Sequence, residues 1–149
     1  LSTLRIEMGH IAGSELDGRT IPYDNSLEGL VSKKKDFIGK RSLDRKAFIA
    51  EDRQKVVGVV PVDKKTSIPE GSHLVKDAMA PIPNPKLGYI SASCWSVEYD
   101  NPFSLAILKD GKNMIGQKLF AMSPLKNKTI PVEIVSSHYV DPKGERVRS

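Results

Sequence analysis

The 149-residue chain is poor in the residues that build disulfides and metal sites. Its single cysteine, Cys94, cannot form an internal disulfide, and one cysteine is too few for a cysteine-rich zinc site. The three histidines, His10, His73 and His138, are far apart and lack the spacing of metal ligands. We therefore expect no metal site. A lone cysteine also fits a reducing environment, so we expect a cytoplasmic protein.

Long apolar runs are absent as well. No run approaches the roughly 20 residues needed to cross a bilayer, and the first residues lack the charged and apolar regions of a signal peptide. We therefore expect no membrane partner. The chain begins with Leu1 rather than Met, which fits a fragment of a longer protein and equally a processed start. With 39% hydrophobic and 28% charged residues, the composition is that of an ordinary soluble globular protein.

The sequence motifs of the common catalytic classes are also missing. There is no nucleophile elbow, phosphate-binding glycine loop, dinucleotide fingerprint, kinase motif or zincin motif, so we assign no catalytic residue. The formal net charge of +5 suggests an anionic ligand or partner. The three consecutive lysines at 33–35 are either a solvated surface or the source of one or two contacts to a small anion. Nucleic-acid binding would need stacking aromatics, and Phe37 is the only aromatic beside this run.

The stretch LRIEMGH, residues 4–10, predicts a short helix that ends at Gly9. Leu1, Leu4 and Met8 recur at helical spacing and predict one buried apolar stripe. Glycine takes the left-handed conformation that ends helices without steric penalty.

Glu7 then lies in the last helical turn, where the helix dipole disfavours a carboxylate by roughly 0.3–1 kcal/mol. Its carboxylate could form a surface ion pair with Arg5 or a lysine. It could instead accept two parallel hydrogen bonds from the flat, amidine-like edge of a heterocycle such as a pterin. The residues alone do not separate these two interpretations.

The chain changes character after Arg53. Before it, the sequence looks helical or mixed and predicts a helix over 43–53 with Ser42 as its N-cap. The buried side of that helix would consist of Leu43, Ala47, Phe48 and Ala50.

After Arg53, several short β-branched segments are separated by turn residues, which predicts a small sandwich or barrel. The predicted strands cover 55–62, 70–75, 86–93, 103–110, 117–123 and 130–137. Asp110-Gly111 suits a type I′ hairpin turn within 109–112. The fold class is therefore α+β, with a first piece of about 50 residues that is too small to fold alone.

An ordered set of segments resembles the folate-dependent aminomethyltransferase family, which includes the glycine-cleavage T-protein. The segments are LRIEMGH, DGRTIPYDNSLEGLVSKKKDFIGKRSL, VVGVVP, EGSHLV, LGYISASCWS and FSLAILKDG. They cover essentially the whole chain, but only the C-terminal half of the family's folate-binding unit. The resemblance implies two domains: the C-terminal part of an aminomethyltransferase-like folate-binding domain over 1–52, and a small antiparallel β-barrel over 53–149.

The resemblance also implies a tetrahydrofolate site. Arg5, Glu7 and Gly9 match the family's Arg-x-Glu-x-Gly signature, whose glutamate hydrogen-bonds the pterin ring. Two charge-assisted bonds of about 1.5–3 kcal/mol each would outweigh the helix-dipole penalty on Glu7. Lys35 best matches the family's basic residue near the benzoyl-glutamate end of folate. The family's catalytic aspartate belongs to the other half of the unit, so Glu7 is assigned a binding role.

Within the family, DGRT, SKKKDFIGKRSL and SCWS look most like the C-terminal part of alpha subunits of heterotetrameric sarcosine oxidases. This resemblance implies a flavoenzyme that oxidatively demethylates sarcosine to glycine, giving 5,10-methylenetetrahydrofolate and hydrogen peroxide. FAD, FMN and NAD would bind elsewhere in the whole enzyme, and beta, gamma and delta subunits would be its partners. The fragment alone would be inactive.

Three other interpretations stay open at this point. Two keep the fold: a glycine-cleavage aminomethyltransferase and a folate domain of the dimethylglycine dehydrogenase type. The third is a basic module that binds nucleic acid or an acidic protein, for which a steep salt dependence of binding to nucleic acid would be evidence.

Overall fold

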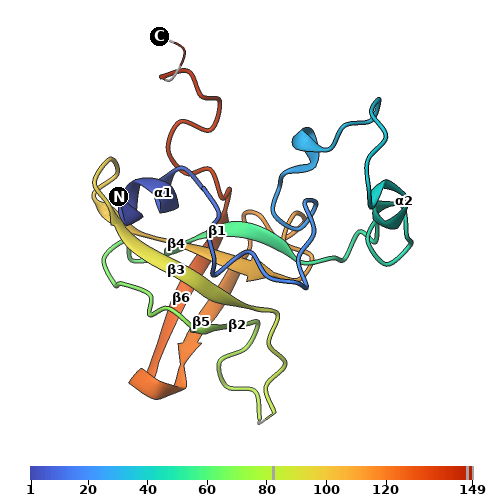
Figure 1. Cartoon of the computed structure of the whole chain (residues 1–149). Helices are drawn as coiled ribbons and strands as arrows, with labels where there is room; N and C mark the ends of the chain where they lie inside the picture. Colours follow the sequence, from blue (N-terminus) through green and yellow to red (C-terminus); the bar gives the residue numbers. More distant parts are fainter. Residues whose placement is uncertain (82, 147, 149) are drawn as a thin grey trace.

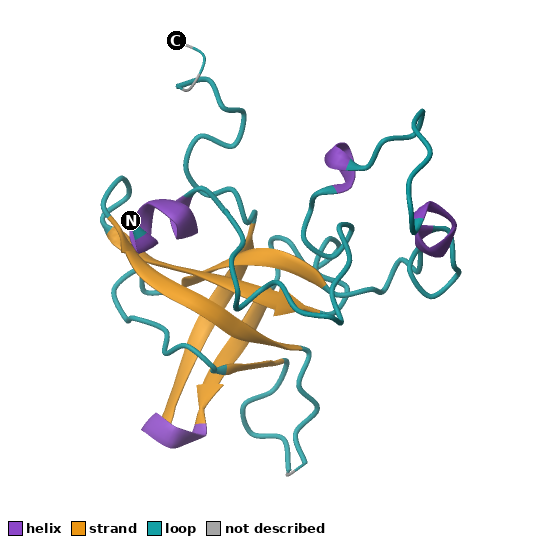
Figure 2. Ribbon diagram, viewed as in Figure 1, coloured by secondary structure: helices purple, strands orange, loops and turns teal. Residues whose placement is uncertain are grey.

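A closed barrel of six antiparallel strands forms the body of the protein in the computed structural model (Figures 1 and 2). The structure describes residues 1–81, 83–146 and 148. The strands are β1 (Lys55–Pro61), β2 (His73–Val75), β3 (Gly88–Ser96), β4 (Asn101–Leu108), β5 (Lys118–Ser123) and β6 (Lys128–Val135). They close in the order β1-β4-β3-β2-β5-β6, so the predicted barrel is confirmed. Among the described residues, no helix is long and apolar enough to cross a membrane.

Strands β1 and β4 are buried on both faces, and this explains their almost continuous apolar sequence. Val57 and Val59 of β1 pack into the barrel interior, whereas their neighbours Val56 and Val60 belong to a second cluster. Ile6 from the N-terminal helix joins that second cluster. The N-terminal residues therefore pack on the outer face of this part of the barrel.

Helix α1 (Ser2–Glu7) ends as predicted, because Gly9 adopts a positive φ of 67° after the C-cap. Its predicted apolar stripe is wrong: Leu1, Leu4 and Met8 are all exposed, and Ile6 and Glu7 are the buried residues. A six-residue helix has fewer than two turns, so a spacing that extends from residue 1 to residue 8 does not define its buried face.

The η1–α2 segment, residues 25–54, extends to one side of the barrel in Figure 1. It contains the 3₁₀ helix η1 (Glu28–Leu30) and the one-turn helix α2 (Lys40–Leu43), which begins after Gly39 at φ 93°. The predicted helix over 43–53 is wrong, since the helix ends at Leu43 instead of continuing, and the intended core residues Ala47 and Ala50 are exposed. A short helix without a buried face gains too little from packing to form.

The predicted type I′ hairpin at Asp110-Gly111 is wrong as well. Residues 109–117 carry the chain from β4 to β5, which are not neighbours in the barrel. Met114 in this connection is buried in the barrel core. Tight antiparallel connections occur instead between β3 and β4, where Ser96 pairs with Asn101, and between β5 and β6, where Ser123 pairs with Lys128.

Candidate functional site

Glu7 joins the end of α1 to the β3–β4 turn. Its side chain is almost fully buried, with 5% of the residue exposed. Oε1 accepts a hydrogen bond from Ser96 Oγ at 2.6 Å and another from the Val97 N–H at 2.9 Å. Oε2 accepts no hydrogen bond from the residues that the structure describes. One carboxylate oxygen is thus fixed by the protein, and the other keeps its capacity to accept.

The backbone of Glu7 is held equally firmly. Its carbonyl accepts hydrogen bonds from the N–H groups of Tyr139 at 3.1 Å and Val140 at 3.0 Å. The Tyr139 ring stacks on Phe103 of β4, with ring centroids 4.3 Å apart and an interplanar angle of 4°. The chain after β6 therefore clamps the end of α1 against the barrel and satisfies a carbonyl that a helix terminus leaves free.

Arg5 lies on the same helix but faces a different partner. Its Nη1 donates to Glu15 Oε2 at 3.2 Å and to the His10 carbonyl at 3.1 Å. Its Nε and Nη2 groups have no hydrogen-bond partner among the described residues. The alternative of a surface pair between Glu7 and Arg5 is thus not what the structure contains, because Arg5 pairs with Glu15.

Glu15 is a fully buried carboxylate that the surrounding polar groups keep charged. Burial by itself raises its pKa. The Ser91 hydroxyl, the Ala12 N–H, the Ser14 hydroxyl and the charge of Arg5 together outweigh burial, so the pKa of Glu15 is below its ordinary value. This network fixes the loop after α1.

Cys94 of β3 lies close enough to Glu7 and Arg5 for their charges to act on its thiol. Burial raises the pKa of its thiol to about 11, and the negative charge of Glu7 contributes in the same direction. Arg5 opposes this shift. A thiol with a raised pKa is mostly protonated near neutral pH and is then a poor nucleophile.

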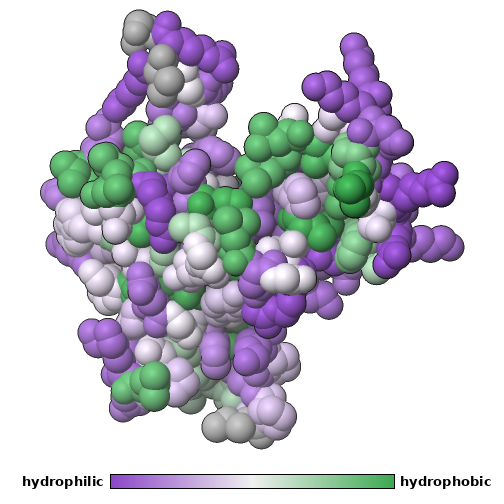
Figure 3. Space-filling view, viewed as in Figure 1, coloured by the Kyte–Doolittle hydropathy of each residue, from purple (hydrophilic) through white to green (hydrophobic). Residues whose placement is uncertain are grey.

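Lys35 lies in the η1–α2 segment, far along the chain from Glu7; Figure 1 shows α2 on the opposite side of the view from α1. Its side chain is exposed at the edge of a hollow of about 400 Å³. The hollow is mainly apolar, as Figure 3 shows beside α2, and its other lining residues are Pro22, Leu27, Leu30, Val31, Ser32, Asp36, Phe37 and Leu43. Neither Glu7 nor Arg5 lines it.

The loop that carries Lys35 is ordered by its own hydrogen bonds. Ser32 Oγ accepts from the Lys35 N–H at 3.0 Å. The Lys40 ammonium donates to the carbonyls of Lys33 at 3.2 Å and Lys35 at 2.8 Å. Lys40 is therefore engaged in shaping the loop, whereas the Lys33, Lys34 and Lys35 side chains have no hydrogen-bond or ion-pair partner among the described residues.

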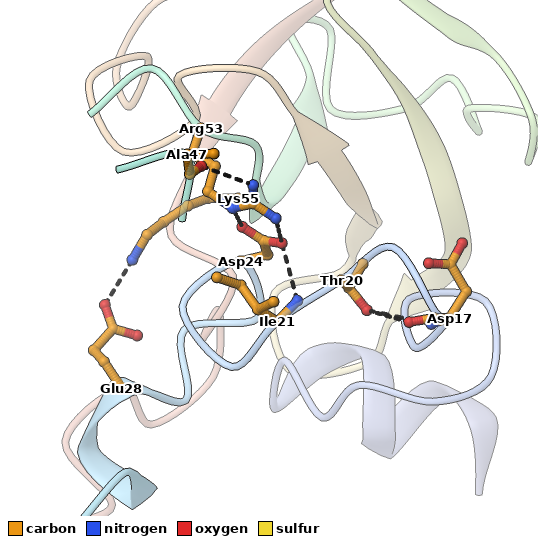
Figure 4. A network of polar contacts seen from close by, with 8 residues as sticks. All are labelled: Asp17, Thr20, Ile21, Asp24, Glu28, Ala47, Arg53 and Lys55. Carbon is orange, nitrogen blue, oxygen red and sulfur yellow. Dashed lines mark hydrogen bonds and ion pairs between the residues drawn. The ribbon is translucent and has the colours of Figure 1, made fainter. Parts of the chain in front are cut away.

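Sequence reasoning missed the ion pair that joins the two ends of the η1–α2 segment next to the start of β1. Arg53 binds the Asp24 carboxylate through two hydrogen bonds of 2.6 Å each (Figure 4). Asp24 is 2% exposed, and the Ile21 N–H donates to the same carboxylate at 3.0 Å. Lys55 adds an ion pair with Glu28 at 2.6 Å. Asp24 and Arg53 are 29 residues apart, so no local pattern in the sequence predicts their contact.

Comparison with curated proteins gives whole-chain matches. The chain is 37% identical over 149 residues to the sarcosine oxidase subunit alpha of Rhizobium meliloti (strain 1021), covering 99% of this chain. The sarcosine oxidase alpha subunits of Corynebacterium sp. strains U-96 and P-1 are 37% and 36% identical over 98% of it. This chain is related to sarcosine oxidase alpha subunits. It spans 15% of the length of each, and no protein-family model matches it.

The fold is that of an aminomethyltransferase. A crystal structure of the glycine cleavage system aminomethyltransferase T from Bartonella henselae superimposes with a TM-score of 0.71 over 95% of this chain, at 21% sequence identity. The match covers 38% of that aminomethyltransferase. The resemblance to the aminomethyltransferase fold and to sarcosine oxidase alpha subunits is therefore confirmed. The assignments of Arg5, Glu7 and Lys35 to a folate site stay predictions.

Proposed function

We propose that this chain is the tetrahydrofolate-binding region of an enzyme of the sarcosine oxidase type. The observation that carries the proposal is the combination of whole-chain similarity to sarcosine oxidase alpha subunits with an aminomethyltransferase fold. The whole enzyme would oxidise sarcosine to glycine and release hydrogen peroxide. Tetrahydrofolate would supply the acceptor for the one-carbon unit, giving 5,10-methylenetetrahydrofolate.

The rest of the enzyme would hold the redox groups and the partner subunits. FAD, FMN and NAD would bind outside these 149 residues, and the beta, gamma and delta subunits would complete the assembly. The boundary between a folate-unit part over 1–52 and a barrel domain over 53–149 belongs to the same proposal. In support, β1 begins at Lys55, and the preceding segment has no strand among the residues that the structure describes.

Glu7 would bind the pterin through one oxygen. Oε1 already accepts two hydrogen bonds, from Ser96 and Val97. If the pterin donated to both carboxylate oxygens, Oε1 would have to accept a third hydrogen bond. We therefore propose that only Oε2 accepts a hydrogen bond from the pterin. A single hydrogen bond to this charged group contributes about 1.5–3 kcal/mol. Ser96 and Val97 would then be positioning groups, because they fix the plane of the carboxylate.

Lys35 would meet the carboxylates at the other end of folate. Its ammonium is exposed beside an apolar hollow with one aromatic wall, Phe37, which suits an aryl group that carries negative charge. Arg5 would donate a hydrogen bond to folate from Nε or Nη2, because its Nη1 already donates to Glu15. Lysine provides charge at this position without the bidentate geometry of arginine.

The experiment for Glu7 is Glu7→Gln in the intact enzyme, with tetrahydrofolate binding measured by calorimetry. Loss of the charge should weaken binding by about 1–3 kcal/mol and largely spare sarcosine oxidation. Glu51→Gln is the matched control, because Glu51 is exposed and has no hydrogen bond or ion pair among the described residues. Unchanged folate affinity in Glu7→Gln would remove Glu7 from the site.

The experiment for Lys35 compares Lys35→Ala with Lys33→Ala. Both lysines are exposed in the same loop, so comparing the two variants separates a specific contact of Lys35 from the effect of removing one positive charge. Lys35→Ala should weaken folate binding more, and the difference should shrink at high salt because an exposed pair is screened. Equal and negligible effects would show that the lysine run is only a solvated surface.

A second candidate keeps the fold and changes the reaction. The similarity to aminomethyltransferase T favours a folate-dependent aminomethyltransfer without flavin. The 21% identity of that match is well below the 37% to the sarcosine oxidase subunits, which is why we place this candidate second. Flavin absorbance in the purified native protein distinguishes the two, since only the sarcosine oxidase type requires flavin.

A further inference from the structure

The net positive charge of this chain is concentrated in one short stretch. Residues 33–46, here called the basic lobe, contain seven basic and two acidic residues, a formal charge of +5. This equals the net charge of the whole chain. The other 135 residues contain 16 basic and 16 acidic residues and are therefore electrically balanced. The charge is a local feature of one loop and helix, not a general property of the surface.

The basic lobe also differs from the rest of the molecule in how its charges are paired. Each ion pair between described residues lies outside 33–46, and two of these pairs involve nearly buried carboxylates, Glu15 and Asp24. Of the basic side chains in the lobe, only Lys40 has a hydrogen-bond partner in the part of the chain that the structure describes, and it donates to backbone carbonyls. The basic side chains without a hydrogen-bond or ion-pair partner among the described residues are Lys33, Lys34, Lys35, Arg41, Arg45 and Lys46.

An apolar side chain stands in the middle of these charges. Ile38 is fully exposed at the turn that precedes α2, between the lysine run and Arg41. The turn is fixed, because Gly39 holds a left-handed φ of 93° and Lys40 bridges two carbonyls of the lysine run. In Figure 3 long hydrophilic side chains project from this side of the molecule. An exposed apolar side chain surrounded by charged residues is typical of a protein contact.

We propose that the basic lobe is a docking surface for an acidic segment of a separate protein, whose apolar side chains contact Ile38. Charge complementarity selects the acidic partner. A cluster of unpaired charge accelerates the encounter of two separate molecules, whereas a contact within one polypeptide gains little from such steering. A nucleic acid would use aromatic stacking, and Phe37, the one aromatic residue of the lobe, lines the hollow beside it.

The test uses the 149-residue chain and two synthetic peptides as probes. One peptide alternates glutamate with leucine, and in the other serine replaces each leucine. The lobe variant combines Lys33→Gln, Lys34→Gln, Arg41→Gln and Arg45→Gln, and leaves Lys35 of the proposed folate site intact. The control variant removes the same charge from exposed lysines elsewhere, namely Lys76→Gln, Lys86→Gln, Lys126→Gln and Lys128→Gln.

The lobe variant should bind the leucine peptide at least about tenfold more weakly at physiological salt, and the control variant within about twofold of the unaltered chain. Ile38→Ser should weaken binding of the leucine peptide and leave binding of the serine peptide unchanged. Equal weakening by the lobe and control variants would overturn the proposal. So would tighter binding of a DNA duplex than of the leucine peptide at the same salt concentration, which would assign the lobe to nucleic acid.

Discussion

The hydrogen bond from Ser96 Oγ to Glu7 Oε1, 2.6 Å long, connects residues that are 89 positions apart. It joins the last residue of α1 to the last residue of β3. The penalty that the helix dipole places on Glu7 is offset here, because a buried carboxylate gains two hydrogen bonds, from Ser96 and Val97. Glu7 therefore has a structural role whether or not it also binds a ligand.

Removal of the Ser96 hydroxyl tests that structural role. Ser96→Ala should lower the free energy of unfolding by about 1–3 kcal/mol, because Glu7 stays buried with one donor fewer. Urea denaturation followed by circular dichroism measures the change. Ser67→Ala is the control, since Ser67 is exposed and should alter stability little. Equal stability of the two variants would show that the bond between Ser96 and Glu7 contributes nothing.

The thiol of Cys94 reports on the charge of Glu7. With a pKa of about 11, Cys94 should react slowly with iodoacetamide at pH 8 and faster as pH rises toward that value. A negative neighbour destabilises the thiolate, so Glu7→Gln should lower the pKa of Cys94 and shift the pH–rate curve to lower pH. The alkylation rate, followed by mass spectrometry, measures the shift. Glu51→Gln should leave the curve in place, and an identical curve for Glu7→Gln would contradict the interaction.

The barrel could be predicted from the sequence because its information is local. Strands such as 118–123 alternate buried and less buried residues, and turn residues separate them from their neighbours. The strand order could not be predicted, since it depends on contacts between distant segments. The same limit explains the wrong hairpin at Asp110-Gly111: the dipeptide permits a tight turn, but β4 and β5 are not adjacent.

For the helices and the site, local sequence was a poor guide, because contacts between distant residues decide their structure. The predicted helix over 43–53 had good local propensity but no surface to pack against. No sequence pattern predicts that Ser96 and Val97 contact Glu7. The contact between Asp24 and Arg53 is likewise not predicted by any local pattern. The expected roles of Glu7 and Lys35 toward folate came from resemblance to a family, since spacing along the chain does not relate them.

Gly9 provides a sharp test of the turn that follows α1. Its φ of 67° disfavours residues with a side chain, and an added Cβ would lie 2.5 Å from the Ser137 carbonyl oxygen. Gly9→Ala should therefore destabilise the fold by more than the roughly 1–2 kcal/mol of the left-handed conformation alone. Gly13→Ala is the matched control, because a Cβ there meets no atom within 4 Å. Thermal unfolding of both variants gives the comparison, and equal midpoints would contradict the close contact.

The Asp24–Arg53 pair should govern how firmly the η1–α2 segment is attached. Asp24→Asn leaves Arg53 without its charged partner at a nearly buried site, which costs about 3–5 kcal/mol when the local structure cannot relax. Because the segment joins the barrel near this pair, we expect Asp24→Asn to favour local unfolding of residues 25–54 over unfolding of the whole protein. Amide hydrogen exchange should accelerate over 25–54 while β3 and β4 stay protected.

The exposed pair between Arg19 and Asp17 is the control for this prediction. Its arginine side chain is 82% exposed, so Asp17→Asn should change stability little and leave exchange over 25–54 unaltered. If Asp24→Asn accelerated exchange equally in all strands, the pair would stabilise the barrel as a whole. If it accelerated exchange nowhere, the segment would be held by its other contacts, such as the Lys55–Glu28 pair. Selective acceleration over 25–54 identifies Asp24 and Arg53 as the attachment point of the segment that carries Lys35 and the basic lobe.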